Sequence, residues 1–352
     1  MKSVSHIVIL TPGFPADEND GNCLPILQNY VRYLKRKCPE ISISVITFQY
    51  PFQKSVYNWN DVDVYAIAGK NKTGFLKLFT WLKVARLILT LSRKNKINVM
   101  HAFWLAECSY VAQVTRFMHH AKVIATILGQ DCLPSNNYLK RLNFESMTVV
   151  ASSEFAANAF LKSTGKAVKN IIPIGLDTES FKYEINQQPK FDVLATGHLN
   201  AVKNYSLFID VIAEVVKTHP EIKTIIAGGG AEFESLKNKI EKLNLQKNIN
   251  LAGEMHRNDV IELMHNSRLF LHTSKHEGQG YVFAEALYAG MSVVAFPVGN
   301  LTKSENIFLC SDKNELVETI CKLMKNNPQR KRILMKSVDE SIADYLKIYE
   351  LD

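Results

Sequence analysis

Short apolar segments alternate with longer amphipathic segments along the chain. The short segments are rich in β-branched residues, which is typical of buried strands. In the first half we expect strands at 5–10, 43–48, 63–68, 97–102, 122–127 and 147–151. Between several of them, segments 24–37, 75–94 and 104–119 have the length of helices. Alternation of strand and helix predicts a parallel sheet with helices on both faces.

The same pattern restarts after a polar, proline-containing segment at 183–190, which fits a linker. The second half predicts strands at 192–196, 222–227, 249–252, 268–272 and 291–296. Its expected helices lie at 203–218, 231–243, 257–265 and 281–289. We therefore predict an α/β protein of two doubly wound domains, 1–185 and 186–337, that face each other across a cleft. Ligands of such sheets bind outside the carboxyl ends of the strands.

Composition agrees with this size and class. A chain of 352 residues is too long for one ordinary domain. With 47% hydrophobic and 22% charged residues, it is neither disordered nor collagenous. The net charge of +8 is uneven, because residues 1–185 carry +9 and residues 186–352 carry −1. We expect the halves to meet different partners. Nucleic acid is not expected, since the basic residues accompany no known nucleic-acid-binding module.

The compartment is inferred from what the sequence lacks. The first apolar run ends at Thr11-Pro12-Gly13 and is too short for a signal peptide. The six cysteines show no C-x-x-C pair and no metal spacing, so reduced thiols in a cytosol are the simplest interpretation. No stretch approaches the roughly 18 apolar residues of a membrane span. We expect a cytoplasmic protein without a bound metal.

The strongest chemical signal is the segment 274–290, which follows an expected strand and opens an expected helix. Gly278 and Gly280 would let a ligand approach the backbone, and free N–H groups at a helix start favour a phosphate. Glu277 lies in the loop and Glu285 in the helix, where carboxylates could accept hydrogen bonds from sugar hydroxyls. The same residues also fit a tight turn with a carboxylate near the helix start.

This segment resembles the donor-site motif of glycosyltransferase family 4, one of the families called glycosyl transferases group 1. Four further segments resemble other motifs of that family, namely 171–181, 196–204, 227–230 and 251–255. The family consists of retaining enzymes with the GT-B fold of two Rossmann-like domains. The resemblance therefore implies this fold, with an acceptor-side first domain and a donor-binding second domain. It also implies that a last helix, about 338–352, packs back on the first domain.

The resemblance implies a role for each matching residue. Glu277 would hold hydroxyls of the donor sugar, Lys203 would neutralise the departing diphosphate, and His198 would assist it. Glu285 would bind the nucleotide ribose. Further donor contacts would come from Gly278, Gly280, Tyr281, Val282, Gly21, Gly230, Gly253 and Met255.

The implied reaction moves a sugar, with retention, from a nucleoside diphosphate sugar to a hydroxyl of a glycan or lipid-linked acceptor. UDP is favoured over GDP, and neither a cofactor nor a metal is needed. A same-face route, which depends on stabilising the leaving diphosphate, is favoured over double displacement. Such an enzyme would act in cell-surface polysaccharide or glycolipid biosynthesis. Two alternatives remain: a non-catalytic partner subunit of this fold, and a GT-B nucleotide-sugar epimerase.

Several positions depart from the family pattern. His198 replaces an arginine, and histidine is only partly charged at neutral pH. The segment Leu128-Gly129-Gln130-Asp131 lacks the histidine of the family's "HGxD", although Asp131 stays a candidate on the acceptor side. His101 ends an expected strand and is a second such candidate. Each of these two residues also fits a purely structural role, Asp131 as a loop cap and His101 as a packed residue. The loop that holds Gly21 lacks the usual doubled glycine.

The basic half has one further feature. Residues 64–106 contain no Asp or Glu. Within the expected helix 75–94, a polar and basic stripe lies opposite an apolar one. The first stripe is Lys83, Arg86, Thr90 and Arg93, and the second is Leu78, Trp81, Leu82, Ala85 and Leu89. This pattern fits a core helix with a solvated face, or an interfacial helix on the anionic inner face of the cell membrane.

Overall fold

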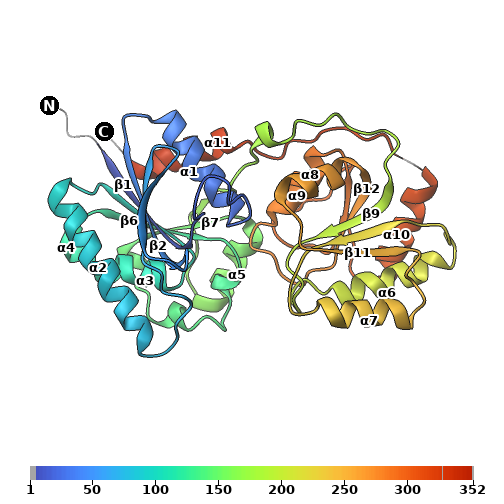
Figure 1. Cartoon of the computed structure of the whole chain (residues 1–352), viewed down its shortest axis with the longest axis horizontal. Helices are drawn as coiled ribbons and strands as arrows, with labels where there is room; N and C mark the ends of the chain where they lie inside the picture. The colour runs from blue at the N-terminus through green and yellow to red at the C-terminus, as the bar shows by residue number, and fades with distance from the viewer. Residues whose placement is uncertain (1–4, 327, 351–352) are drawn as a thin grey trace. The chain divides into compact units, whose positions relative to one another are not determined.

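The computed structural model describes residues 5–326 and 328–350, which form two compact units (Figure 1). Unit 1 comprises residues 1–174 and 338–352, and unit 2 comprises residues 175–337. The boundary thus lies earlier than the expected 185/186. The segment expected as a linker belongs to unit 2, where the Asn186 side chain donates to Asn266 Oδ1 at 2.9 Å.

Unit 1 holds an eight-stranded sheet within the described residues, in the order β3-β4-β2-β1-β5-β6-β7-β8. Its strands are β1 (His6–Gly13), β2 (Ser42–Tyr50), β3 (Ser55–Trp59), β4 (Val62–Ala66), β5 (Val99–Phe103), β6 (Lys122–Ile127), β7 (Thr148–Ala151) and β8 (Asn170–Ile171). All neighbours pair in parallel except β3 and β4, which form an antiparallel hairpin around Asn60 and Asp61. The expected parallel sheet is confirmed, with the hairpin as an unforeseen edge.

Helices cover both faces of this sheet, because alternate residues of its central strand point to opposite sides. Val8 and Leu10 of β1 join one core cluster, and Ile7 and Ile9 join the other. The helices of the first face are α2 (Leu76–Lys94), α3 (Glu107–Val114), α4 (Arg116–His119) and α5 (Glu154–Thr164). Those of the second face are α1 (Pro25–Lys37) and α11 (Val338–Tyr349), which pack on each other (Figure 1).

A buried polar network fixes α11 in unit 1. The ring of His101 in β5 is fully buried, with its Nδ1 at 2.7 Å from the Tyr349 hydroxyl and its Nε2 at 2.8 Å from Thr126 Oγ1. The hydroxyl of Tyr345 lies 3.1 Å from the same Thr126 oxygen, and Tyr30 of α1 bonds to Tyr349. Two elements far apart in the sequence are thereby tied through satisfied polar groups.

Unit 2 holds a six-stranded parallel sheet within the described residues, in the order β11-β10-β9-β12-β13-β14. Its strands are β9 (Phe191–Thr196), β10 (Thr224–Ala227), β11 (Ile249–Gly253), β12 (Ser267–His272), β13 (Ser292–Ala295) and β14 (Ile307–Leu309). Its helices are α6 (Tyr205–Val216), α7 (Phe233–Lys242), α8 (Arg257–His265), α9 (Tyr281–Tyr288) and α10 (Lys313–Asn326). The order reverses at β9, so neighbouring loops diverge there and leave room for a ligand.

The expected helix 75–94 forms as α2, but it packs through a different face. Its buried residues are Thr80, Val84, Ile88 and Leu91, at helical spacing. The stripe expected in the core is instead partly exposed, and Leu78 and Leu82 lie on the surface. In the described ranges no helix combines the length and the apolar character needed to cross a membrane.

Candidate functional site

The site begins at two loops that follow neighbouring strands of unit 2. Residues 197–204 follow β9, and residues 273–280 follow β12. The hydroxyl of Thr273 donates to the Lys203 carbonyl at 3.1 Å, and that of Ser274 donates to the Val202 carbonyl at 3.1 Å. The Lys275 N–H also donates to the Val202 carbonyl at 3.1 Å. These bonds hold the two loops together, so the side chains of Lys203 and Glu277 meet.

Glu277 sits between two partners at the carboxyl edge of the sheet. Its Oε1 atom accepts from Lys203 Nζ at 2.5 Å and from His272 Nε2 at 2.8 Å. An ionised carboxylate can only accept, so Nε2 is the protonated ring nitrogen of His272. Within the part of the chain that the structure describes, no hydrogen bond is made to Oε2. One oxygen of Glu277 is thus fixed by the protein while the other stays available to a ligand.

The charges of this cluster follow from its surroundings. Desolvation by burial raises the pKa of Glu277, but the hydrogen bond from His272 and the charge of Lys203 outweigh it and lower the pKa to about 2. Burial lowers the pKa of His272, which the bond to Glu277 offsets only in part. At neutral pH the cluster therefore holds an anionic Glu277, and Lys203 supplies the opposing positive charge.

Helix α9 begins beside this cluster at Gly280. Gly280 adopts a left-handed conformation with φ of 72°, and a Cβ atom there would lie 2.2 Å from the Phe283 ring. Both constraints require glycine. Gly278 is buried in the preceding loop, while Tyr281 and Val282 begin the helix as half-buried residues. No acidic residue occupies its first turn, so the positive end of the helix dipole could receive an anion.

Glu285 lies one turn into α9 and is buried beside Arg257, the first residue of α8. Arg257 Nη1 is 2.6 Å from Glu285 Oε1. A buried carboxylate needs such a partner, because an isolated buried charge is costly. Arg257 was not expected from the sequence, although a buried Glu285 implies a nearby cation.

Arg330 supports both helices from their other ends. Its guanidinium donates to the carbonyls of Met264 and His265 at the end of α8, and to those of Ala289 and Gly290 after α9. A further bond reaches the carbonyl of Asn186. The last carbonyls of a helix have no partner within the helix, so Arg330 satisfies groups that would otherwise be orphaned. It thereby fixes the two helices that carry Arg257 and Glu285.

The remaining donor-side positions surround the ends of β10 and β11. Gly230 packs against the loop after β9, since a Cβ atom there would lie 2.5 Å from the Leu199 carbonyl oxygen. Gly253 ends β11 with φ of 75°, and Met255 follows it half-buried. His198 is exposed on the same loop as Leu199. All these positions therefore lie at the carboxyl edge of the unit 2 sheet.

The sequence-based candidates of unit 1 are different. Gly21 lies in a turn, where a Cβ atom would meet nothing within 4 Å, so no steric reason requires glycine. His101 is a sequence-based candidate on the acceptor side, but it is fully buried and both ring nitrogens are paired, with a pKa lowered to about 3 by burial. His101 therefore has no surface to offer an acceptor. The structural interpretation of this residue is the correct one.

Asp131 also has a structural role. Its Oδ2 accepts from the Leu105 N–H at 2.8 Å, and its Oδ1 accepts from the Gly129 N–H at 2.7 Å. The carboxylate is buried, and desolvation raises its pKa against these bonds. Asp131 joins the loops that follow β5 and β6, so its assignment as an acceptor contact gains no support from the geometry.

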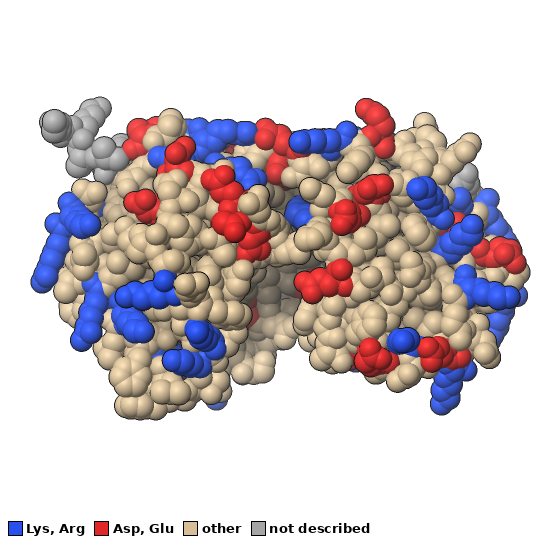
Figure 2. Space-filling model, in the orientation of Figure 1, with Lys and Arg blue, Asp and Glu red and all other residues tan. Residues whose placement is uncertain are grey.

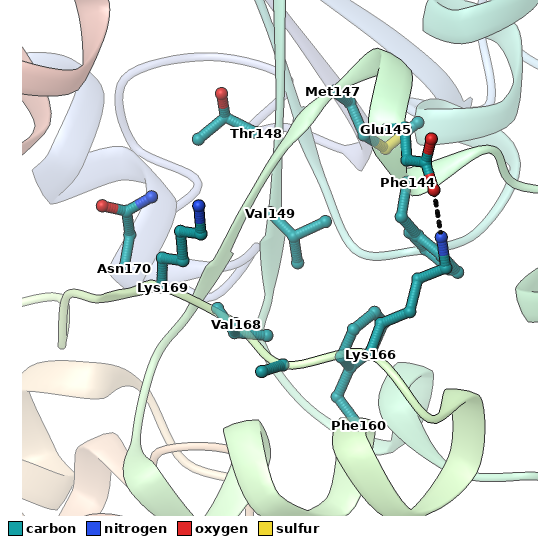
Figure 3. A pocket seen from close by; sticks show the side chains of 11 residues that line it. Phe144, Glu145, Met147, Thr148, Val149, Phe160, Lys166, Val168, Lys169 and Asn170 are labelled. Carbon is teal, nitrogen blue, oxygen red and sulfur yellow. Dashed lines mark hydrogen bonds and ion pairs between the residues drawn. The ribbon is translucent and has the colours of Figure 1, made fainter.

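A pocket of about 420 Å³ lies at the β7–β8 edge of unit 1 (Figure 3). Figure 3 shows Lys166 bonded to Glu145 on one side, at 2.9 Å, and Lys169 and Asn170 on the other. None of its lining residues belongs to the motifs identified from the sequence. Because this ion pair is exposed, it adds little rigidity or specificity.

Comparison with known proteins bears on unit 2 above all. The family model described as "Glycosyl transferases group 1" matches residues 177–336, which is nearly all of that unit. Unit 2 is therefore similar to the domains that this family model describes. An uncharacterized glycosyltransferase of Haemophilus influenzae is 31% identical over 144 residues, 39% of this chain and 40% of that protein.

The gpi3 subunit of the Schizosaccharomyces pombe phosphatidylinositol N-acetylglucosaminyltransferase is 27% identical over 157 residues. That alignment covers 43% of this chain and 34% of the relative, so the chain spans well under half of either curated relative. Over the whole chain, the crystal structure of Anabaena HepE in complex with UDP and glucose is similar with a TM-score of 0.71. It is 18% identical, and the match covers 98% of this chain and 95% of HepE. The GT-B fold of two Rossmann-like domains is thus confirmed for this chain.

Proposed function

We propose that this protein transfers a sugar, with retention of configuration, from a UDP-sugar to an acceptor hydroxyl. The observation that carries the proposal is the meeting of Lys203, Glu277 and the start of α9 at one edge of the unit 2 sheet. These groups provide a cation, a fixed carboxylate and the positive end of a helix dipole within one small region. The family match of residues 177–336 and the UDP bound to HepE support it.

In the proposed reaction the diphosphate leaves from the anomeric carbon of the donor sugar. Lys203 and the N–H groups at the start of α9 stabilise the negative charge that develops on it. The free Oε2 atom of Glu277 accepts hydrogen bonds from sugar hydroxyls. The acceptor oxygen bonds to the anomeric carbon on the face that the diphosphate leaves, and the hydroxyl proton passes to an oxygen of that diphosphate, so no covalent enzyme intermediate is needed. No metal is required in this scheme, because protein groups carry the charge compensation.

The nucleotide occupies the neighbouring loops in this proposal. Glu285, oriented by Arg257, accepts hydrogen bonds from the ribose hydroxyls. The segment from Gly253 to Met255 lies against the base, and Gly230 allows the backbone to approach it. His198 lies on the same loop as Lys203 and adds positive charge when protonated. The roles of Gly278, Tyr281 and Val282 are backbone contacts to sugar and phosphate.

A thermal-shift screen tests the donor site directly. UDP or a UDP-sugar at about 100 times its Kd should stabilise unit 2 by about 2.7 kcal/mol, which is a rise in Tm of about 5 °C or more. The Lys203→Ala variant should lose most of this shift. Lys242→Ala, at an exposed position on α7, is the matched control and should keep it. If no nucleoside diphosphate raises the Tm, the proposal is wrong.

Product analysis separates transfer from its alternatives. Release of UDP only in the presence of acceptor, with an α-configured product from an α-configured donor, supports retaining transfer. Conversion of one UDP-sugar to another without acceptor would indicate an epimerase. Binding of UDP without any turnover would indicate a partner subunit.

We propose that the acceptor is a glycan or a lipid-linked sugar, used in the synthesis of cell-surface polysaccharide or glycolipid. In this proposal unit 1 binds the acceptor at the inner face of the membrane. The relative in Schizosaccharomyces pombe is named for a phosphatidylinositol acceptor, which supports a lipid-linked one. The positive charge of unit 1 also supports it. Its 22 basic and 15 acidic residues give +7, against +1 for unit 2.

A further inference from the structure

The start of α2 exposes large apolar side chains. Since α2 packs through Thr80, Val84, Ile88 and Leu91, its opposite side faces solvent. Phe75, Phe79 and Leu82 follow one another on that side, at spacings of four and three residues. Their exposed fractions are 75%, 52% and 47%. Leu76 and Leu78 flank them and are also exposed. We call these five residues the apolar patch.

The patch is preorganised on a fixed helix. The rings of Phe75 and Phe79 contact edge to face, with centroids 5.8 Å apart. On the inner side of α2, Lys77 Nζ lies 3.2 Å from Glu107 Oε2, and Trp81 Nε1 donates to the same oxygen at 3.1 Å. Gln49 donates to the other oxygen of Glu107 at 2.7 Å. These buried bonds hold the first turns of α2 in place.

Positive charge surrounds the patch. Along the outward side of α2, the apolar side chains of the first turns give way to Arg86 and Arg93, with Lys83 beside them. These three residues are exposed, as are Lys70 and Lys72 just before the helix. Residues 64–106 contain no acidic residue, and Glu107 is buried and paired. Figure 2 shows blue and tan side chains where Figure 1 places α2.

This combination favours a lipid surface over a protein partner. The centre of a protein interface is depleted of lysine, because a buried unpaired ammonium is costly. A second copy of the chain would also bring two basic surfaces face to face. Anionic headgroups instead pair with the Lys and Arg side chains, while aromatic and leucine side chains enter the acyl boundary.

We propose that unit 1 docks on an anionic lipid surface through the apolar patch, with Lys83, Arg86 and Arg93 against the headgroups. The helix lies in the plane of the surface, and its first turns enter more deeply than its last. The proposal rests on the proposed function only for its purpose, which is to reach a lipid-linked acceptor. The docking itself needs no nucleotide sugar.

Sedimentation with vesicles of phosphatidylglycerol and phosphatidylcholine tests the patch. The Phe75→Ser/Phe79→Ser/Leu82→Ser variant should bind about tenfold more weakly than the unaltered protein, or worse, at both low and high salt. The matched control is Leu161→Ser/Leu243→Ser, which removes two exposed leucines elsewhere and should bind normally. The Lys83→Gln/Arg86→Gln/Arg93→Gln variant should lose binding mainly at low salt, because salt screens the charges it removes.

Three results would overturn the proposal. These are absence of binding to anionic vesicles at low salt, equal binding by the patch variant, and equal loss in the Leu161→Ser/Leu243→Ser control. Sedimentation velocity without lipid adds a fourth, because a dimer that the patch variant abolishes would assign the patch to a second copy. UDP-induced thermal shifts of the same variants test the donor site separately from membrane docking. If docking fails while the thermal shift persists, the docking proposal is wrong and the proposed function still stands.

Discussion

The two units place polar residues at equivalent edges of similar sheets and use them differently. In unit 1, His101 and Asp131 have both polar side-chain atoms bonded within the unit. In unit 2, Glu277 is held by Lys203 and His272 through a single oxygen. A saturated group stabilises the fold, whereas a group with a remaining acceptor can also meet a ligand. The position at a strand end therefore does not by itself identify a functional residue.

The largest expected effect concerns the unit 2 cluster. Lys203→Ala should lower the rate of sugar transfer by about 10²–10³, because a preorganised charge opposite the leaving group is removed. Glu277→Gln keeps the shape of the side chain but removes its negative charge, and it should lower the rate of sugar transfer by a similar factor. Initial rates of UDP release measure both, and Lys242→Ala is the control. Full activity in either variant would show that the unit 2 cluster, like the network of unit 1, has only a structural role.

The next effect concerns the saturated network of unit 1. His101→Leu removes one of the two buried partners of each of the Thr126 and Tyr349 hydroxyls, and leaves them only Tyr345 and Tyr30. It should lower the free energy of unfolding of unit 1 by about 2–4 kcal/mol. Tryptophan fluorescence in urea isolates this unit, because Trp59, Trp81 and Trp104 all belong to it. UDP binding by unit 2 should persist, and its selective loss with unchanged stability would restore His101 as a functional residue.

A pair of glycine substitutions sharpens the contrast further. Gly280→Ala must place a Cβ against the Phe283 ring at a positive φ, which we expect to cost about 1–3 kcal/mol and to weaken UDP binding. Gly21→Ala meets no atom and should leave UDP binding and stability almost unchanged. Calorimetric titration with UDP measures both. A large loss of UDP binding in Gly21→Ala would instead indicate that the loop around Gly21 contributes to the donor site.

The smallest effect is a pH dependence of unit 1. The buried His101 has a pKa of about 3, whereas an unfolded histidine titrates near 6.5. Between these values only the unfolded state takes up the proton, so stability falls as the pH falls from about 6.5. One such group contributes a slope of at most about 1.4 kcal/mol per pH unit. His101→Gln should reduce the slope of urea stability between pH 7 and pH 5. An unchanged slope would show that His101 is protonated in the fold.

Much of this architecture is readable from the sequence, because buried strands and amphipathic helices leave periodic patterns. The strand expected at 122–127 and the helix expected at 257–265 form with those bounds. Helix α10 buries Leu316, Ile320 and Leu323 at helical spacing, yet it was not among the expected elements. The hairpin strand β3 is also missing from the expected elements, because several of its residues are exposed and the segment lacks a continuous apolar run.

The site is only partly readable in the same way. Motif spacing selects Lys203 and Glu277, which the structure brings together. His272 escapes because it ends an apolar strand, where a histidine resembles a packing residue. Arg257 and Arg330 escape because their partners come from distant segments, and no local pattern reports such contacts.

In helix 75–94 two faces are apolar enough to pack, namely the expected apolar stripe and the face that holds Thr80, Val84, Ile88 and Leu91. The choice between them depends on the tertiary position of α3 and the sheet rather than on periodicity. The sequence therefore predicts the helix correctly but assigns its buried face wrongly.

The return of α11 to unit 1 has a consequence for synthesis on the ribosome. Unit 2 is continuous in the sequence, so it can complete its core once residue 337 has left the exit tunnel. Unit 1 must wait for Tyr345 and Tyr349, which close the network around His101. Residues 1–174 thus wait for an element that is translated after all of unit 2, in contrast to the usual order in which the earlier domain folds first.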